Sequence, residues 1–146
     1  MVQYPIEFDA TVWKDSDDPQ WHIETTEGLT ITGDEPVSFG GTDDNPSPED
    51  LFTASIASCI VSTFTTIAER KELEYDAIEA ETEAVLDRGE DTRPVITEAT
   101  IDITVFGVTD TNNAGAVEQA TRKNCFIHNS VKTEVEISFT FEEMAL

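Results

Sequence analysis

The longest uncharged stretch of the chain, LFTASIASCIVSTFTTIA at residues 51–68, constrains the fold more than any other feature. Its larger side chains recur at steps of three and four residues, the spacing that places them on one buried helix face. These residues are Phe52, Ile56, Cys59, Ile60, Thr63, Phe64 and Ile67. Ser47, Pro48 and the acidic pair Glu49–Asp50 precede the stretch and are typical of a helix start. We therefore predict a long helix that carries Cys59 on its buried face.

This helix would nearly be long enough to cross a membrane, because eighteen helical residues span roughly 27 Å. Its composition indicates otherwise, since seven of the eighteen residues are Ser or Thr and charged residues stand at both ends. The N-terminal MVQYPIEFDA also lacks the basic region and the apolar run of a signal peptide. We expect a soluble cytoplasmic protein with no membrane partner, whose thiols stay reduced unless they have a redox role.

The helix has no charged outer face. A half-buried helix normally exposes charged residues on the side away from the core, whereas residues 51–68 carry no charge around their whole circumference. In a chain of this size, the simplest cover for that side is a second copy of the same chain. The sequence therefore predicts a homodimer with this helix at its centre.

The chain is strongly acidic, with 31 Asp and Glu against 8 Lys and Arg and a net charge of −23. This charge repels phosphate backbones and anionic lipid surfaces, so nucleic acid is not an expected partner. It also destabilises a compact fold in dilute buffer, while molar salt shortens the Debye length to ~3 Å and removes most of the repulsion. A halophilic source explains the composition; an acidic protein from a low-salt organism is the alternative.

Alternating apolar and polar residues predict strands on both sides of the long helix. The expected strands are 4–13, two short ones within 21–33, a hairpin of 75–89 with 94–108, and 134–143. A loop rich in Gly, Pro and Asp fills residues 34–48, and a shorter helix over 112–124 ends just before Cys125. We predict one domain, residues 1–146, with an α+β fold in which helices pack on one face of antiparallel sheet.

The two cysteines, Cys59 and Cys125, are 66 residues apart, and the residue pattern leaves three interpretations open. They are small buried hydrophobic residues, or metal ligands, or a redox pair. A metal site would use the C-x-x-H arrangement of Cys125 and His128, with Cys59 and His22 as further ligands, but no paired CxxC or HxxxH motif supports it. His128 also has two interpretations, as a base that deprotonates Cys125 or as a solvated or hydrogen-bonded side chain.

The run GGTDDNPSPEDLFTASIASCIVSTF, followed after the second helix by NCFIHNSVK, resembles the OsmC/Ohr family of osmotically inducible and organic hydroperoxide resistance proteins. The resemblance covers nearly the whole chain. The positions that carry it are Gly40, Gly41, Asn45, Pro46, Glu49, Leu51, Phe52, Cys59 and Cys125. It implies an intertwined α+β homodimer with two active sites at the subunit interface.

The resemblance further implies thiol-dependent reduction of small organic hydroperoxides in oxidative or osmotic stress defence. Cys59 would be the peroxidatic thiol and Cys125 the resolving one, so the two sulfurs would have to meet. This chemistry needs no metal, flavin or other cofactor, and a dithiol or lipoyl-type reductant would regenerate the thiols. The apolar residues that we expect to bind the substrate are Phe52, Ile56 and Phe64.

In the peroxidases of this family, an arginine from the N-terminal strands pairs with a glutamate in the first turn of the helix and holds the thiolate. Glu49 matches the glutamate, although negative charge at a helix N-terminus accounts for it equally well. Glu49 precedes Cys59 by ten helical residues, or ~15 Å, so it would reach the thiol only from the partner subunit.

No arginine precedes Arg70 in this chain. The residues that we consider as replacements are Lys14, His22, Arg88 and Arg93. Two hypotheses therefore stand: a cysteine peroxidase with a different thiolate partner, or a non-catalytic member of the family that binds a small apolar ligand at the dimer interface.

Overall fold

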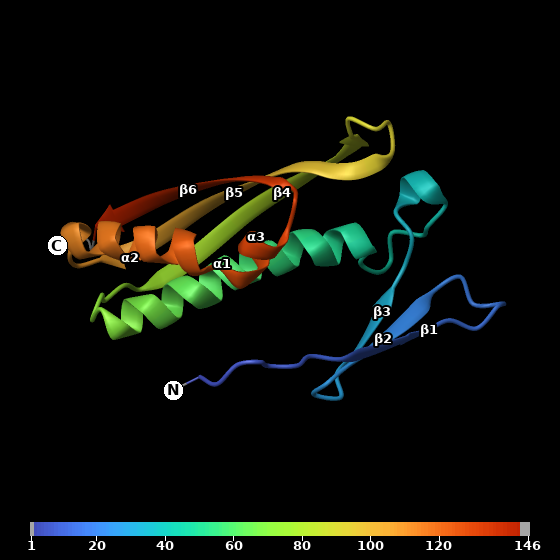
Figure 1. The fold of residues 1–146 in the computed structure, drawn as a ribbon, viewed down its shortest axis with the longest axis horizontal. Coiled ribbons are helices and arrows are strands. Elements are labelled where there is room, and N and C mark those ends of the chain that lie inside the picture. Colours follow the sequence, from blue (N-terminus) through green and yellow to red (C-terminus); the bar gives the residue numbers. More distant parts are fainter. Residues whose placement is uncertain (1, 144–146) are drawn as a thin grey trace. The chain divides into compact units, whose positions relative to one another are not determined.

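The structure is a computed structural model that describes residues 2–143. These residues form two compact units, one ending at Phe52 and the other beginning at Thr53. Figure 1 shows the elements of each unit, coloured along the chain. That the two units act as a single domain over residues 1–146 stays a prediction.

The N-terminal unit contains an antiparallel meander of β1 (Ala10–Trp13), β2 (Trp21–Thr25) and β3 (Thr30–Gly33). The two short strands expected within residues 21–33 are confirmed. The strand expected over residues 4–13 forms only over its last four residues. The reason lies in the register, because Ala10 faces Thr25, the last residue of β2, and the residues before Ala10 have no strand to pair with.

The loop after β3 contains a short 3₁₀ helix, η1 (Val37–Phe39), that the sequence pattern did not predict. A buried carboxylate organises this loop. Asp34 accepts hydrogen bonds from the amides of Glu35, at 2.8 Å, and Thr42, at 3.1 Å, and also from the Thr42 hydroxyl. The bond from that hydroxyl is the main reason why the pKa of Asp34 lies below its usual value. Asp34 thus accepts three hydrogen bonds within the loop that leads to the long helix.

Helix α1 (Pro48–Arg70) is the predicted long helix. Its start is a capping box, in which the Asp50 amide donates to the Ser47 hydroxyl at 3.1 Å and the Ser47 amide donates back to the Asp50 carboxylate at 2.9 Å. One face is buried, through Ile56, Ala57, Ile60, Phe64 and Ala68. By length and composition alone α1 could cross a membrane, a test that core helices of soluble proteins also pass.

The second unit contains a sheet in the order β4 (Ala77–Arg88), β5 (Pro94–Val108), β6 (Glu134–Glu143). The hairpin of β4 and β5 is confirmed. The sheets are antiparallel as predicted except at β6, which runs parallel to β5. Helix α2 (Thr111–Asn124) lies between these strands in the chain and carries it back to the starting end of β5, as a crossover to a parallel strand requires.

One face of this sheet forms the core, through Ala99, Ile101, Ile103 and Val105 of β5 and Ile137 of β6. Two helices cover that face. The Phe64 ring of α1 stacks on Phe139 of β6 with centroids 5.9 Å apart, and the Arg122 guanidinium of α2 lies 5.3 Å from the same Phe139 ring. Figure 1 shows α1 and α2 running alongside the sheet.

Candidate thiol site

The structure brings the two cysteines together. Cys59 lies in the middle of α1, and Cys125 is the single residue between α2 and the short helix α3 (Phe126–Ser130). Cys59 lies close enough to Cys125 to raise the pKa of the Cys125 thiol. The amide of Ile127, two residues after Cys125, donates a hydrogen bond to Cys59 Sγ at 3.5 Å. Both residues are free thiols in this structure.

The two thiols differ in exposure, and burial changes the pKa of Cys125. Cys59 is half-buried, whereas Cys125 has no exposed surface. Burial raises the pKa of Cys125 to about 11, and the neighbouring Cys59 also raises it, while the amides of His128 and Ile127 act in the opposite direction. Cys125 is therefore protonated at neutral pH, and Cys59 is the thiol that a small molecule reaches first.

The predicted substrate-binding residues lie at different depths. Ile56 and Phe64 are completely buried. Phe64 packs in an aromatic cluster with Tyr75, Phe139 and Phe141, so the structure places it in the core. Phe52 is half-buried and belongs to the N-terminal unit. In the single chain, Ile56 and Phe64 are therefore packing residues of the core.

Two exposed apolar residues beside the thiols were missed by the sequence analysis. Phe126 and Ile127 follow Cys125 directly, with 65% and 37% of their surfaces exposed. They form the first turn of α3, which at five residues is too short to show a helical period. The remaining signal was the apolar pair itself, in the segment NCFIHNS.

Glu49 does not take part in this cysteine cluster within α1. It is half-buried in the first turn of the helix, ten residues before Cys59. At 1.5 Å per residue, this spacing puts the two backbone positions ~15 Å apart along the helix. Ser47 and Asp50 make the capping hydrogen bonds of that turn.

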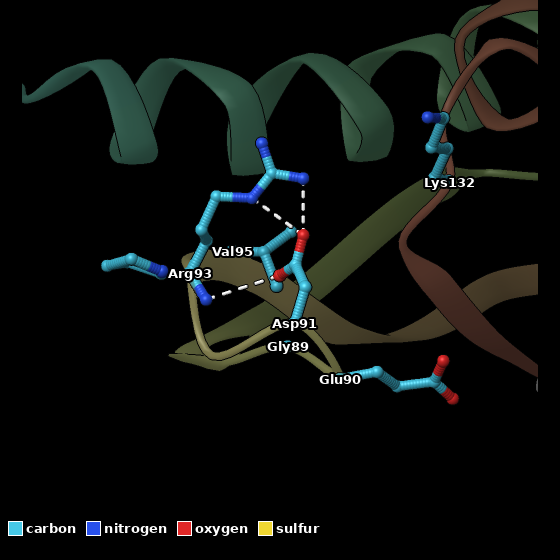
Figure 2. A pocket seen from close by; sticks show the side chains of 7 residues that line it. Gly89, Glu90, Asp91, Arg93, Val95 and Lys132 are labelled. Atoms are coloured by element: carbon cyan, nitrogen blue, oxygen red, sulfur yellow. Dashed lines mark hydrogen bonds and ion pairs between the residues drawn. The ribbon is translucent and has the colours of Figure 1, made fainter.

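Each of the four cations considered as a replacement for the missing arginine has a partner near it in the chain. Arg93 binds the Asp91 carboxylate through Nε, at 2.6 Å, and also through its terminal nitrogen, as Figure 2 shows. Arg88 donates to the Thr92 carbonyl at 2.8 Å. His22 lies 3.3 Å from the Asp18 carboxylate, and Lys14 donates to the Asp15 carbonyl at 3.4 Å. None of these bonds involves a cysteine.

The cavity drawn in Figure 2 lies at the tip of the β4–β5 hairpin and has a volume of about 560 Å³. Its lining residues are Gly89, Glu90, Asp91, Arg93, Pro94, Val95 and Lys132. It contains two acids and two bases but no thiol. This cavity is therefore separate from the cysteine pair.

The metal interpretation gains no support from the geometry. Within residues 2–143, no three His, Cys, Asp or Glu side chains are grouped so that they could hold a metal ion. His22 interacts with Asp18 and with the Thr32 hydroxyl, at 3.3 and 3.4 Å. The Nδ1 atom of His128 is buried and has no hydrogen-bond partner among the described residues, so this atom is not solvated.

Comparison with solved structures supports the α+β fold. An OsmC-like protein from Vibrio cholerae superposes with a TM-score of 0.84 at 21% identity, covering 93% of this chain and 100% of that one. An organic hydroperoxide resistance protein from Elizabethkingia anophelis gives a TM-score of 0.76 at 19% identity, with 97% and 99% covered. OhrB of Bacillus subtilis gives 0.67 at 21% identity, with 93% and 98% covered.

These identities establish the fold alone, and it confirms the predicted OsmC/Ohr-type architecture. A comparison with curated protein sequences found no match. The family is shown by a different comparison, in which the model described as OsmC-like protein matches residues 41–140, more than half of the chain. That range contains both cysteines and the helix that carries Cys59. The chain therefore belongs to the OsmC-like protein family.

Proposed function

We propose that this protein reduces small organic hydroperoxides, with Cys59 as the peroxidatic thiol and Cys125 as the resolving thiol. The observation that carries the proposal is that Cys59 of α1 lies beside the α2–α3 junction that holds Cys125: the Ile127 amide donates to Cys59 Sγ at 3.5 Å, and Cys59 raises the pKa of Cys125. Two structures with the same fold are organic hydroperoxide resistance proteins by name, which supports this class of substrate.

The reaction balances with groups that the chain and its substrates supply. The Cys59 thiolate attacks one peroxide oxygen and the O–O bond breaks, so that Cys59 becomes a sulfenic acid and the other oxygen leaves, after protonation, as an alcohol. Cys125 loses its proton and its sulfur attacks the Cys59 sulfur, which releases water and forms the disulfide. An external dithiol, free or of the lipoyl type, then reduces the disulfide and is itself oxidised.

The different burial of the two thiols favours this order of roles. Cys59 is the accessible sulfur, so the peroxide meets it first. Cys125 is fully buried and its raised pKa keeps it protonated and unreactive toward peroxide at neutral pH. It reacts once the sulfenic acid has formed in direct contact with it. A cytoplasmic dithiol pool suits this cycle, and we place the protein, which folds as a soluble OsmC-like domain, in the cytoplasm.

The homodimer belongs to the same proposal. In the single chain, the exposed side of α1 is formed by small uncharged residues, namely Ala54, Ser58, Ser62, Thr65 and Thr66. A second copy would cover this side, and the distance along α1 means that Glu49 reaches Cys59 only if the partner supplies it.

The test is consumption of cumene hydroperoxide with dithiothreitol in molar KCl, where the acidic chain is screened. We expect turnover in the wild type and in Thr140→Ser, a control at an exposed position of β6 outside both the cysteine pair and the uncharged side of α1. We expect none in Cys59→Ser. Equal turnover with and without the Cys59 thiol would overturn the proposed function.

A non-catalytic binder of a small apolar ligand is the second candidate. One observation favours it: the N-terminal unit contains an apolar cavity of about 400 Å³ that has no thiol. Its lining residues are Val12, Trp21, Ile23, Glu35, Pro48 and Leu51. Cumyl alcohol should then raise the melting temperature of wild type and Cys59→Ser equally, without any peroxide turnover.

A further inference from the structure

We propose that the backbone amide of Ile127 is the fixed donor that stabilises the Cys59 thiolate in this chain. This assignment rests on the proposed function, because it gives the peroxidatic thiol its partner. It makes Ile127 a positioning residue that acts through its main chain. The side chain of the residue is secondary to this role.

The geometry supports the assignment. Ile127 is the second residue of α3, and the first four amides of a helix have no acceptor within the helix. Its N–H is therefore available; it donates to Cys59 Sγ at 3.5 Å and also acts on the neighbouring Cys125 thiol. A thiolate accepts such a bond far more strongly than a neutral thiol, since charge-assisted hydrogen bonds are about twice as strong as neutral ones. The amide thus favours the charged form of Cys59.

The donor is held rigidly, which is what makes an amide effective at a reacting atom. The Asn129 amide donates to the Cys125 carbonyl at 3.0 Å, and the Ser130 hydroxyl donates to the Phe126 carbonyl at 2.6 Å. The Asn129 side chain also ties this turn to the end of α2, through the Lys123 carbonyl at 3.1 Å. The Ile127 amide therefore keeps its direction when the sulfur changes charge.

The charged side chains offer no equal alternative in the contacts described. Arg88 and Arg93 are bound within the β4–β5 turn, and Arg122 binds Glu118 at 2.9 Å and covers the Phe139 ring. Besides the neighbouring Cys125 thiol, the donor described at Cys59 Sγ is the Ile127 amide. The main chain of α3 therefore supplies what the resemblance would assign to an arginine.

The test replaces single amides by esters, which exchanges N–H for O and leaves the side chain unchanged. The ester at position 127 removes the donor to Cys59. The ester at position 126 is the matched control, because the Phe126 N–H makes no bond with Cys59. Each ester also weakens one carbonyl of this turn: the ester at 126 weakens that of Cys125, which accepts from the Asn129 amide, and the ester at 127 weakens that of Phe126, which accepts from the Ser130 hydroxyl.

The readout is the rate at which iodoacetamide alkylates Cys59 in the reduced protein, followed by peptide mass spectrometry from pH 5 to pH 10 without peroxide. The loss of one hydrogen bond to a charged group should slow alkylation at pH 7 about tenfold and move the midpoint of the pH profile upward by about one unit. The control should stay within about twofold of the wild type. An unchanged profile in the ester at 127 would overturn the assignment.

A second pair of variants makes the same comparison with ordinary residues. Ile127→Pro removes the donor, and Phe126→Pro places proline at the first helical position, where it is well tolerated. Alkylation needs no peroxide chemistry, so it tests the role of the Ile127 amide independently of the proposed peroxidase function. Turnover that persists in Cys59→Ser refutes the peroxidase, whereas a normal alkylation profile without the Ile127 amide refutes only its role.

Discussion

Phe64 offers a sharp test of the packing, because the sequence assigned it to the substrate and the structure places it in the core. We consider Phe64→Ala. The ring is completely buried, and its centroid lies 5.5 Å from that of Tyr75, 5.9 Å from Phe139 and 6.4 Å from Phe141. Truncating a buried Phe typically costs ~3–5 kcal/mol, and the lost aromatic pairs place this site at the upper end of that range.

The measurement is the free energy of unfolding in urea, in molar KCl, with Phe126→Ala as the control. Phe126 is 65% exposed, so its truncation should change the free energy by less than ~0.5 kcal/mol. Phe64→Leu should lie between the two and should leave KM for cumene hydroperoxide unchanged. A Phe64→Ala variant as stable as the control, or a Phe64→Leu variant that is stable but has a greatly raised KM, would refute the core assignment.

Three further predictions follow from charge and exposure. On the solvent face of the sheet, Glu81 stands opposite Asp102, and the two negative charges repel each other. Glu81→Lys should therefore raise the free energy of unfolding in urea by ~0.5 kcal/mol in 0.1 M KCl and by much less in 2 M KCl. An equal effect at both salt concentrations would contradict this. The pKa of Cys125 is raised from 9.0 to about 11, so between these two pH values the folded chain holds a proton that the unfolded chain has lost. The free energy of unfolding should therefore keep its full value below pH 9 and fall as the pH rises through 11. Cys125→Ala should lack this decline, and an identical alkaline profile in both proteins would exclude the mechanism. The uncharged exposed side of α1 predicts a dimer by light scattering in molar KCl, and a monomer there would count against the dimeric site.

The sequence was most informative where local signals agree. The start of α1 followed from Ser47, Pro48 and the acids after them, and the structure shows a capping box at that place. The alternation in EVEISFTFEE predicted the extent of β6 but not its direction, because a strand has the same period of two in parallel and antiparallel pairs. Its direction depends on the crossover through α2, which is a tertiary feature.

The site was less accessible to sequence reasoning than the fold. The residue pattern left three interpretations of the cysteines open, and the redox interpretation came from the family resemblance. The structure adds the contact of Cys59 with Cys125 and the difference in their burial. The Ile127 amide could not have been found from the sequence, because a main-chain donor leaves no mark on residue identity and α3 is only five residues long.

The central claim is that Cys59 and Cys125 form one redox pair, and one titration tests it most directly. The reduced protein in molar KCl is treated with one equivalent of cumene hydroperoxide, and both thiols are then counted and mapped by mass spectrometry. The contact between the sulfurs predicts that both free thiols disappear together and that an intramolecular disulfide joins the peptides containing Cys59 and Cys125. Sulfinic acid on Cys59 with Cys125 still free would contradict the paired-thiol mechanism.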